Sequence, residues 1–227
     1  DGRARVFAAA VKGVLLGQAS SRLAAMSAIS NASEELFSAS IDDHARSLMW
    51  VACNDVDDDI AAVGRSVWDR CGCSTSTCMV DVVVTYCSHD AVDVRGSACK
   101  ALGSLVDSLK EAEPAIIGLS LSRVTDEMYA AGTTLSRRLG AAQCLKELGV
   151  HLSGDEVFAS LEFLLAQGFL DTDPDVRTSM MAAGVAVIGA ADAVKAEAIL
   201  PIMEKYLENP KDRGLSEEQY DHVRLGA

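Results

Sequence analysis

The stretch "DTDPDVRTSM", Asp171 to Met180, has the composition of a helix start. Asp173 can accept hydrogen bonds from the backbone amides that a first helical turn leaves unpaired, and Pro174 suits the first helical position because its missing N–H is not needed there. Asp175 adds negative charge at the positive end of the helix dipole. The apolar residues that follow recur on one helical face, which must be buried: Val176, Met180, Ala183, Val187 and Ile188.

The composition favours helices over sheets. The chain has 227 residues, of which 49% are hydrophobic and 5% aromatic. It can bury a sizeable core, but it lacks the aromatic and β-branched alternation of sheet proteins. Runs such as "AAQCLKELG" have a helical period, whereas "VDVVVTYC" from Val80 to Cys87 is ambiguous between strand and helix. We therefore predict an all-α fold.

Neither a membrane span nor a secretion signal is expected. The longest weakly polar stretch, Met180 to Val194, is interrupted by Asp192 and is shorter than the ~20 apolar residues that a span needs. No basic segment followed by an apolar one opens the sequence, although a start at Asp1 without methionine suggests that the true start lies upstream. The seven cysteines are an odd number, and several lie among apolar helical residues, which favours a reducing, cytoplasmic setting.

The helix start at Asp171 recurs along the chain. We predict that its acids and arginines are structural repeat positions: Asp93, Arg95, Asp173, Arg177, Asp221 and Arg224. Two degenerate copies complete the series, since "DVDDDIAAVGRSVWDRCG" has the acids without the arginine, and "LSRRLGAAQCLKELG" has Arg138 without the acids. An apolar position recurs at intervals of roughly 34 to 47 residues, close to the ~40 to 47 of HEAT or armadillo repeats: Ile60, Val94, Leu139, Val176 and Val223.

These repeats predict a HEAT or armadillo-type α-solenoid of about five to six helical hairpins, because a single hairpin cannot bury its own apolar face. Residues 1–227 form one solenoid segment in this interpretation, with inner helices starting near residues 59, 93, 137, 174 and 221. A first helix precedes each inner helix; one begins with Ser153 and Glu156 in capping-box spacing. We expect the arginines, Arg95 and Arg177 above all, to pair with aspartates at helix starts.

A cysteine-rich loop is the one candidate metal site. "CGCSTSTC" supplies Cys71, Cys73 and Cys78, and Cys87 with His89 follows. Thiolates and imidazole suit zinc, but the spacing is not the paired two-residue gap of zinc ribbons or fingers. The alternative is an inter-helix loop with incidental thiols, and we predict no metal or cofactor.

The sequence offers little for catalysis. The four histidines fall near predicted helix ends or turns, without a nucleophile elbow, a phosphate loop or a His-Glu-x-x-His helix: His44, His89, His151 and His222. Carboxylates in the repeat starts are explained by helix capping. We therefore predict that the chain is not an enzyme.

Several segments resemble one family of HEAT proteins. "SVWDRCG" followed by "VDVRGSACKAL", then "LEFLLAQGFLDTDPDVRTSMMAAGVAVIGA", "LPIMEKYLENP" and "YDHVRLGA", is similar in order and spacing to the large ribosome-associated HEAT-repeat proteins of general amino-acid control. These are translational activators of the stress kinase that phosphorylates initiation factor two. The resemblance covers roughly residues 45 to 227. The "CGCSTSTC" loop and residues 1–40 depart from it.

The resemblance implies a scaffold that lies along ribosomes, just before a region similar to elongation factor three, with the kinase bound by other regions. A net charge of -13 argues against direct, sequence-specific nucleic-acid binding and favours basic ribosomal proteins as partners. Isolated basic points are possible contacts: Arg137 with Arg138, Arg3 with Arg5, and Lys211 with Arg213. The alternative is a transport or assembly adaptor, of the karyopherin or proteasome-scaffold kind.

The last residues begin a predicted helix that they do not complete. "RLGA" opens an apolar helical face that has no residues left to complete it, and a solenoid end normally carries a polar capping repeat. We expect a longer protein with further repeats and an exposed apolar surface at Leu200, Ile202, Met203 and Tyr206.

Overall fold

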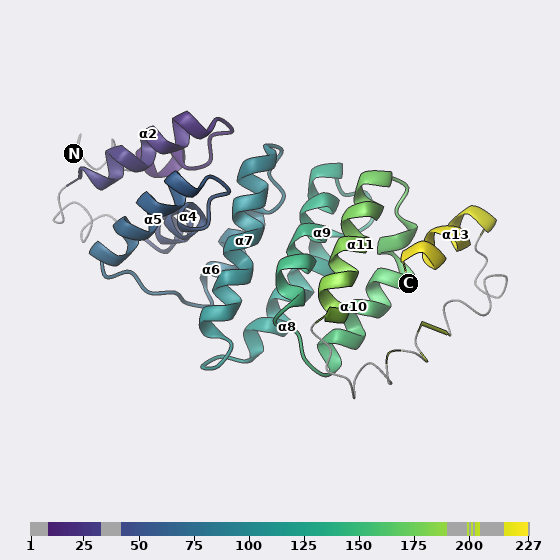
Figure 1. Cartoon of the computed structure of the whole chain (residues 1–227). Helices are drawn as coiled ribbons and strands as arrows, with labels where there is room; N and C mark the ends of the chain where they lie inside the picture. The colour runs from purple at the N-terminus through teal and green to yellow at the C-terminus, as the bar shows by residue number, and fades with distance from the viewer. Residues whose placement is uncertain are drawn as a thin grey trace. The chain divides into compact units, whose positions relative to one another are not determined.

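The computed structural model describes residues 9–32, 42–189, 199, 201, 203–204 and 216–226. This part of the chain is built of helices and contains no strand, so the all-α prediction is confirmed (Figure 1). The chain divides into two compact units, Asp1–Ile116 and Ile117–Ala227. The prediction of a single solenoid segment stays a prediction.

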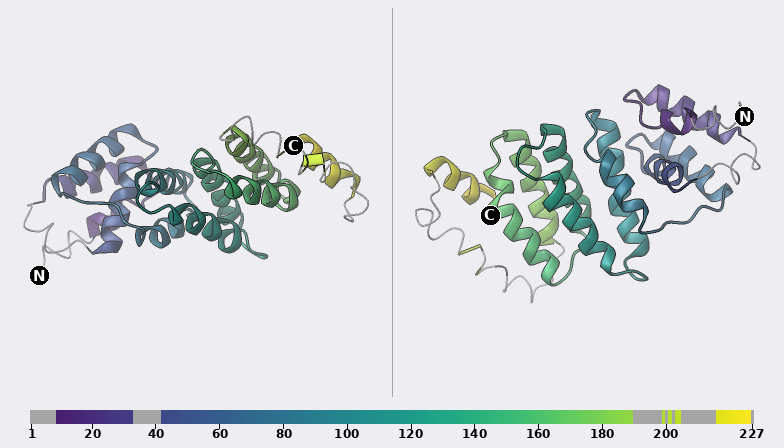
Figure 2. Two further views of the ribbon diagram at one scale, coloured as in Figure 1. Left: turned by 90° about the horizontal axis from the view of Figure 1, so that it is seen from below. Right: turned by 180° about the vertical axis from the view of Figure 1, so that it is seen from behind.

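The first unit is made of stacked helical hairpins. Its helices are α2 (Ala19–Ser30), α4 (Asp43–Cys53), α5 (Asp58–Arg70), α6 (Met79–Tyr86) and α7 (Val92–Leu109). Helix α4 packs on α5, α6 packs on α7, and α2 packs on α5, as Figures 1 and 2 show. Helix α4 also contacts α6 and α7, so that each hairpin buries the apolar face of its neighbour.

The second unit follows the same plan. Helix α8 (Ala115–Ser122) crosses the boundary and continues as a π-helical segment, Arg123–Met128. The remaining elements are α9 (Leu135–Gly149), α10 (Asp155–Ala166), a 3₁₀ turn at Gly168–Leu170, α11 (Pro174–Gly189) and α13 (Glu217–Gly226). Helices α9 and α11 lie side by side, α10 packs on α11, and α13 contacts the 3₁₀ turn.

The ambiguous stretch from Val80 to Cys87 is helical. Its buried side chains are Met79, Val80, Val83, Val84 and Cys87. Their spacing of one, three and four residues places them on one helical face, where they pack against α4 and α7. Tertiary burial of this face therefore overrides the β propensity of consecutive valines.

The inner helices begin at Asp58, Val92, Leu135, Pro174 and Glu217. Ile60, Val94 and Val176 are each the third residue of their helix and are buried. The repeat alignment predicts all five apolar positions in the first turn of an inner helix. For two of them this was wrong, because Leu139 is the fifth residue of α9 and the buried Val223 is the seventh of α13.

The early start of α13 has a local cause that the sequence shows. Ser216 N donates to Gln219 Oε1 at 2.9 Å, and Gln219 N donates to Ser216 Oγ at 3.2 Å. This reciprocal capping box satisfies two backbone donors and fixes the helix start at Glu217.

Helix α11 buries most of its predicted face. Val176, Met180, Ala183 and Val187 are fully buried, whereas Ile188 is 37% exposed. No helix in the described ranges is long and apolar enough to cross a membrane. Of the predicted C-terminal apolar surface, Met203 is half-buried, and Leu200, Ile202 and Tyr206 lie outside the described residues.

The hairpin of α4 and α5 depends on a glycine. A Cβ on Gly64 would lie 2.8 Å from the backbone of Ala52 and Cys53, closer than real Cβ contacts allow. Only a hydrogen side chain lets the two helix backbones approach to this distance.

We expect Gly64→Ala to lower the free energy of unfolding by about 1–3 kcal/mol, because α5 must move away from α4. Gly118→Ala in α8 is the matched control, since its Cβ would meet nothing within 4 Å. The control should be neutral or gain up to about 1 kcal/mol from helix propensity. Urea unfolding followed by circular dichroism compares the two, and equal stabilities would contradict the close approach.

Candidate functional site: arginine-bonded turns

In α2, α7, α9 and α11 the fourth residue is an arginine that bonds to the turn before its helix. Each guanidinium bends back over its own helix start, and Nη1 donates to backbone carbonyls five or six residues earlier. The bonds are Arg22 to Leu16 O (3.2 Å) and Gly17 O (3.1 Å), Arg95 to His89 O (2.9 Å) and Asp90 O (3.3 Å), Arg138 to Thr133 O (2.9 Å), and Arg177 to Asp171 O (2.7 Å). We call the segments that supply these carbonyls the arginine-bonded turns.

Two of these arginines also reach the turn of a following repeat. Arg22 pairs with Asp55 through two bonds, Nε to Oδ2 at 2.8 Å and Nη2 to Oδ1 at 3.0 Å. Arg138 Nε donates to Asp171 Oδ2 at 2.9 Å. The partners are 33 residues apart in both pairs. The same side-chain position therefore joins successive repeats in each unit.

The paired aspartates organise the next helix start. Asp55 Oδ1 accepts from Asp57 N at 2.9 Å, and Asp171 Oδ1 accepts from Asp173 N at 2.8 Å. Asp57 and Asp173 then cap their helices, as the sequence predicts for Asp173. Asp57 Oδ1 accepts from Asp59 N and Ile60 N, and Asp173 Oδ1 accepts from Asp175 N and Val176 N.

The expected partners of Arg95 and Arg177 were wrong. Both arginines donate to backbone carbonyls of their own turns, and the carboxylate pairs belong to Arg22 and Arg138 instead. Asp173 accepts instead, through Oδ1, from Asp175 N and Val176 N at the start of α11.

Other predicted repeat acids make weaker contacts. Asp93 Oδ2 lies 3.5 Å from Nη2 of Arg22. Asp221 and Arg224 are 4.0 Å apart, with side chains 62% and 65% exposed, so their attraction is largely screened by solvent.

The Arg22–Asp55 pair is buried, with side chains 1% and 2% exposed. Burial disfavours the charged guanidinium, but the hydrogen bonds and charges of Asp55 and Asp93 outweigh it and raise the pKa of Arg22. Arg22 is therefore a permanent buried cation, held by the carboxylate of Asp55 and two carbonyls, with Asp93 at a longer distance.

Tyr129 completes the corresponding site in the second unit. Its hydroxyl donates to Asp171 Oδ2, and its ring packs edge-on against Phe163 with centroids 5.1 Å apart. Burial, then the hydrogen bond to Asp171 and its charge, raises the pKa of Tyr129, while Arg138 acts in the opposite direction.

The candidate zinc ligands are not brought together. Among the described residues, no three of Cys71, Cys73, Cys78, Cys87 and His89 place their ligand atoms within 4.8 Å of one another. His89 Nδ1 instead accepts from Ala91 N at 3.1 Å. In the described part of the chain, the loop thiols therefore do not form one ligand set with Cys87 and His89.

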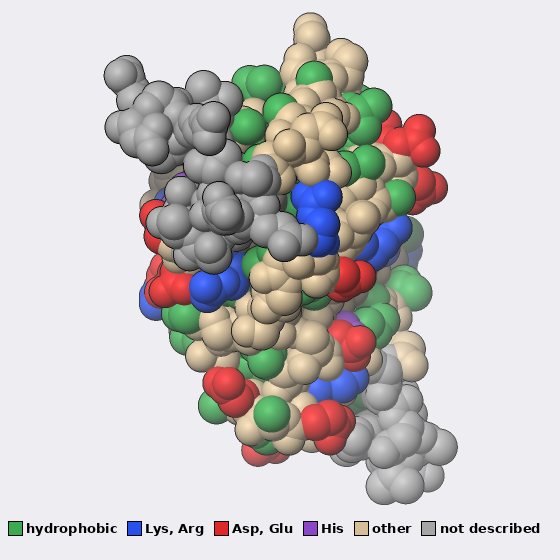
Figure 3. Space-filling model, turned by 90° about the vertical axis from the view of Figure 1, so that its left-hand side faces the viewer, with side chains coloured by type: hydrophobic (Ala, Val, Ile, Leu, Met, Phe, Trp, Pro, Cys, Tyr) green, Lys and Arg blue, Asp and Glu red, His purple; other side chains and the backbone are tan. Residues whose placement is uncertain are grey.

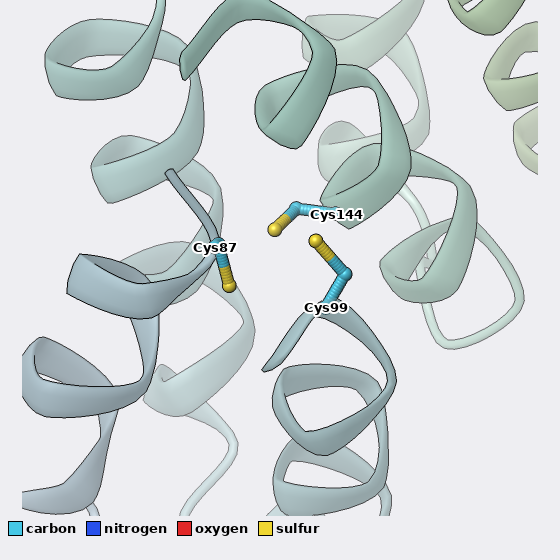
Figure 4. A group of neighbouring side chains, drawn as sticks. All are labelled: Cys87, Cys99 and Cys144. Atoms are coloured by element: carbon cyan, nitrogen blue, oxygen red, sulfur yellow. The ribbon is translucent and has the colours of Figure 1, made fainter. Parts of the chain in front are cut away.

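The buried thiols lie in the helical core. Figure 4 shows Cys87 at the end of α6 and Cys99 on α7, and it labels Cys144, which belongs to α9 of the second unit. The Sγ atoms of Cys87 and Cys99 lie within 4.8 Å of each other, and Cys87 Sγ donates to Val83 O at 3.3 Å. Burial also raises the pKa of the Cys53 thiol to about 12. These thiols pack as small hydrophobic groups.

The predicted contact residues differ in their surroundings. Arg138 is engaged by Asp171 and is 23% exposed, whereas Arg137 is half-buried beside it in the first turn of α9. Arg3, Arg5, Lys211 and Arg213 lie outside the described residues.

We expect Arg22→Ala to lower the free energy of unfolding by about 3–5 kcal/mol, because Asp55 would remain buried without a counter-charge. Arg46→Ala is the matched control, since Arg46 pairs with Asp43 at 2.7 Å but with side chains 30% and 66% exposed. That change should cost about 0–1 kcal/mol. Urea unfolding measures both, and similar losses would show that burial of the Arg22 pair has no special weight.

Tyr129 should make stability depend on alkaline pH. Its raised pKa means that the folded chain keeps the phenol neutral at pH values where the unfolded chain, with a pKa near 10, ionises. The stabilisation is complete below about pH 10 and is lost as pH rises through the folded-state pKa. Tyr129→Phe should therefore lose stability less steeply than wild type between about pH 10 and 12. Urea unfolding at each pH tests this, and parallel curves would contradict it.

Comparison with known proteins identifies the family. A family model described as the HEAT repeats of the stalled ribosome sensor GCN1 matches residues 37–227. Protein ILITYHIA of Arabidopsis thaliana is 29% identical over 187 residues, covering 78% of this chain and 7% of that protein. The stalled ribosome sensor GCN1 of Homo sapiens is 22% identical over 192 residues, with the same two coverages.

The chain thus spans about 7% of the length of these curated relatives. No solved structure matches it. Because the family model covers most of the sequence and the described part consists of repeated helical hairpins, the chain belongs to the HEAT-repeat family of the stalled ribosome sensor GCN1.

Proposed function

We propose that the chain is a non-enzymatic scaffold segment of a ribosome-associated translational regulator that activates the stress kinase acting on initiation factor two. The observation that carries this proposal is the family match over residues 37–227, together with a human relative named as a stalled ribosome sensor. We place the segment just before the region similar to elongation factor three. The kinase is bound by other regions of the full protein.

The hydrogen bonds made by the charged side chains of the turns support a scaffold role. In the arginine-bonded turns, guanidinium and carboxylate groups bond to one another and to backbone atoms, where they fix helix starts. Catalysis needs acids, bases or nucleophiles that are held near a substrate site. Here the charged groups are used to fix one repeat on the next, which suits a protein that spaces and presents surfaces.

Charge favours protein partners over nucleic acid. The net charge of -13 opposes binding to a phosphate backbone and attracts basic ribosomal proteins. On the face drawn in Figure 3, acidic side chains are interspersed with basic and hydrophobic ones. Because Arg138 is engaged by Asp171, Arg137 is the better candidate for a ribosome contact in the first turn of α9.

A transport or assembly adaptor is the second candidate function. The same acidic balance would attract basic cargo to a helical solenoid, as import receptors do. The two functions differ in their partner, so ribosome binding separates them.

We expect the 227-residue chain to co-sediment with purified ribosomes and Arg137→Glu to weaken this binding several-fold, because a cation in contact with the ribosome becomes an anion. Lys146→Glu is the matched control, since Lys146 is an exposed cation on the same helix. The control should bind as wild type does. A chain that stays in the supernatant at low salt, or equal losses for both variants, would count against the ribosome contact at Arg137.

A further inference from the structure

Three aliphatic side chains of the first unit are exposed at helix starts. Leu16, Val56 and Val92 are 49%, 37% and 63% exposed. Leu16 precedes α2, Val56 precedes α5, and Val92 is the first residue of α7. Single exposed aliphatic residues are common on protein surfaces, but a contiguous group marks an interaction site. We call these three residues the apolar edge.

Val56 lies against the face of α7 that carries Val92. A Cβ on Gly96 would lie 3.1 Å from Cγ1 of Val56, so Val56 rests over Gly96. Gly96 follows Val92 by four residues, which places both on the same helical face. Val56 N also donates to Ser97 Oγ at 3.0 Å and so fixes the turn against the helix.

Leu16 is held next to the same helix start. A Cβ on Gly17 would lie 3.3 Å from the Cβ of Ala91, the residue before Val92. The buried Arg22 bonds both to Leu16 O and to Asp55, the neighbour of Val56. One guanidinium therefore joins the turns that carry the apolar edge.

Acidic side chains surround the apolar edge. Asp58 and Asp59, both exposed, follow Val56 in the first turn of α5. Asp90, which is exposed, and Asp93, whose side chain is 48% exposed, flank Val92. The nearby cations balance them only in part. Arg22 is buried against Asp55, Arg95 is buried and bonded to the carbonyls of His89 and Asp90, and the exposed Lys12 lies one turn before Leu16.

We propose that the apolar edge docks a basic polypeptide segment of a partner protein, one that combines lysine or arginine with an aliphatic side chain. The aliphatic group packs on Val56 and Val92, and the cations lie beside Asp58, Asp59 and Asp93. Charge complementarity selects this occupant over a second copy of the chain or a nucleic acid, since either would bring further negative charge to the edge. The proposal stands whether or not the chain binds ribosomes.

Synthetic peptides test this surface without ribosomes. The probe is a fluorescein-labelled dodecapeptide made of two Lys-Leu-Lys-Lys-Leu-Lys units, compared with one that has serine for leucine and one that has glutamate for lysine. Fluorescence anisotropy with the 227-residue chain should show binding of the Lys-Leu peptide alone. Equal binding of the serine peptide would reduce the interaction to non-specific charge attraction and overturn the proposal, and so would binding of the glutamate peptide.

Matched variants locate the site. Val92→Ser should weaken binding of the Lys-Leu peptide about tenfold, because it removes an apolar contact at the centre of the edge. Val150→Ser is its control, since Val150 is 62% exposed but belongs to the second unit. These substitutions are at exposed positions, and circular dichroism melts check that the variants are folded. Wild-type affinity in Val92→Ser, or an equal loss in Val150→Ser, would overturn the proposal.

The charges are tested in the same way. The double variant Asp58→Asn with Asp59→Asn should bind the Lys-Leu peptide several-fold more weakly and with a smaller dependence on salt, because two screened attractions are lost. Asp155→Asn is the control, an exposed acid in the first turn of α10. An unchanged salt dependence in the double variant would contradict the acidic contribution.

Discussion

The buried guanidinium at the fourth position of a helix is the constraint on which the repeat packing depends. A charge removed from water must be matched by hydrogen bonds and a counter-charge, or folding is strongly disfavoured. Arg22 meets this requirement with two carbonyls of its own turn and the carboxylate of Asp55. A different placement of α5 against α2 would leave that charge uncompensated, so the pair selects one arrangement of successive repeats.

The second unit contains an arginine–aspartate pair of the same kind. Arg138 and Asp171 repeat the pairing in the second unit, and Tyr129 donates to the same carboxylate. These charged and polar groups are bonded to one another within the fold. A HEAT-repeat segment of this kind offers a surface and a fixed spacing, which agrees with the family to which the chain belongs.

The exposure of the apolar edge follows from the hydrogen bonds that Arg22 makes inside the first unit. Arg22 brings the turns before α2 and α5 to the start of α7, and this leaves Leu16, Val56 and Val92 exposed together. The aspartates that cap and flank these helix starts give the edge its negative charge. Helix capping, repeat packing and partner recognition thus draw on the same short turns.

The sequence alone determined the helical class, the cap at Asp173 and the buried face of α11 up to Val187, because capping and helical periodicity act over a few neighbouring residues. It also contained the capping box of Ser216 and Gln219, which would have placed the start of α13. Only the tertiary structure decided that the Val80 stretch is a helix and that the carboxylate pairs belong to Arg22 and Arg138. Those partners lie 33 residues away, and the choice between a carbonyl and a carboxylate depends on which turn packing brings within reach.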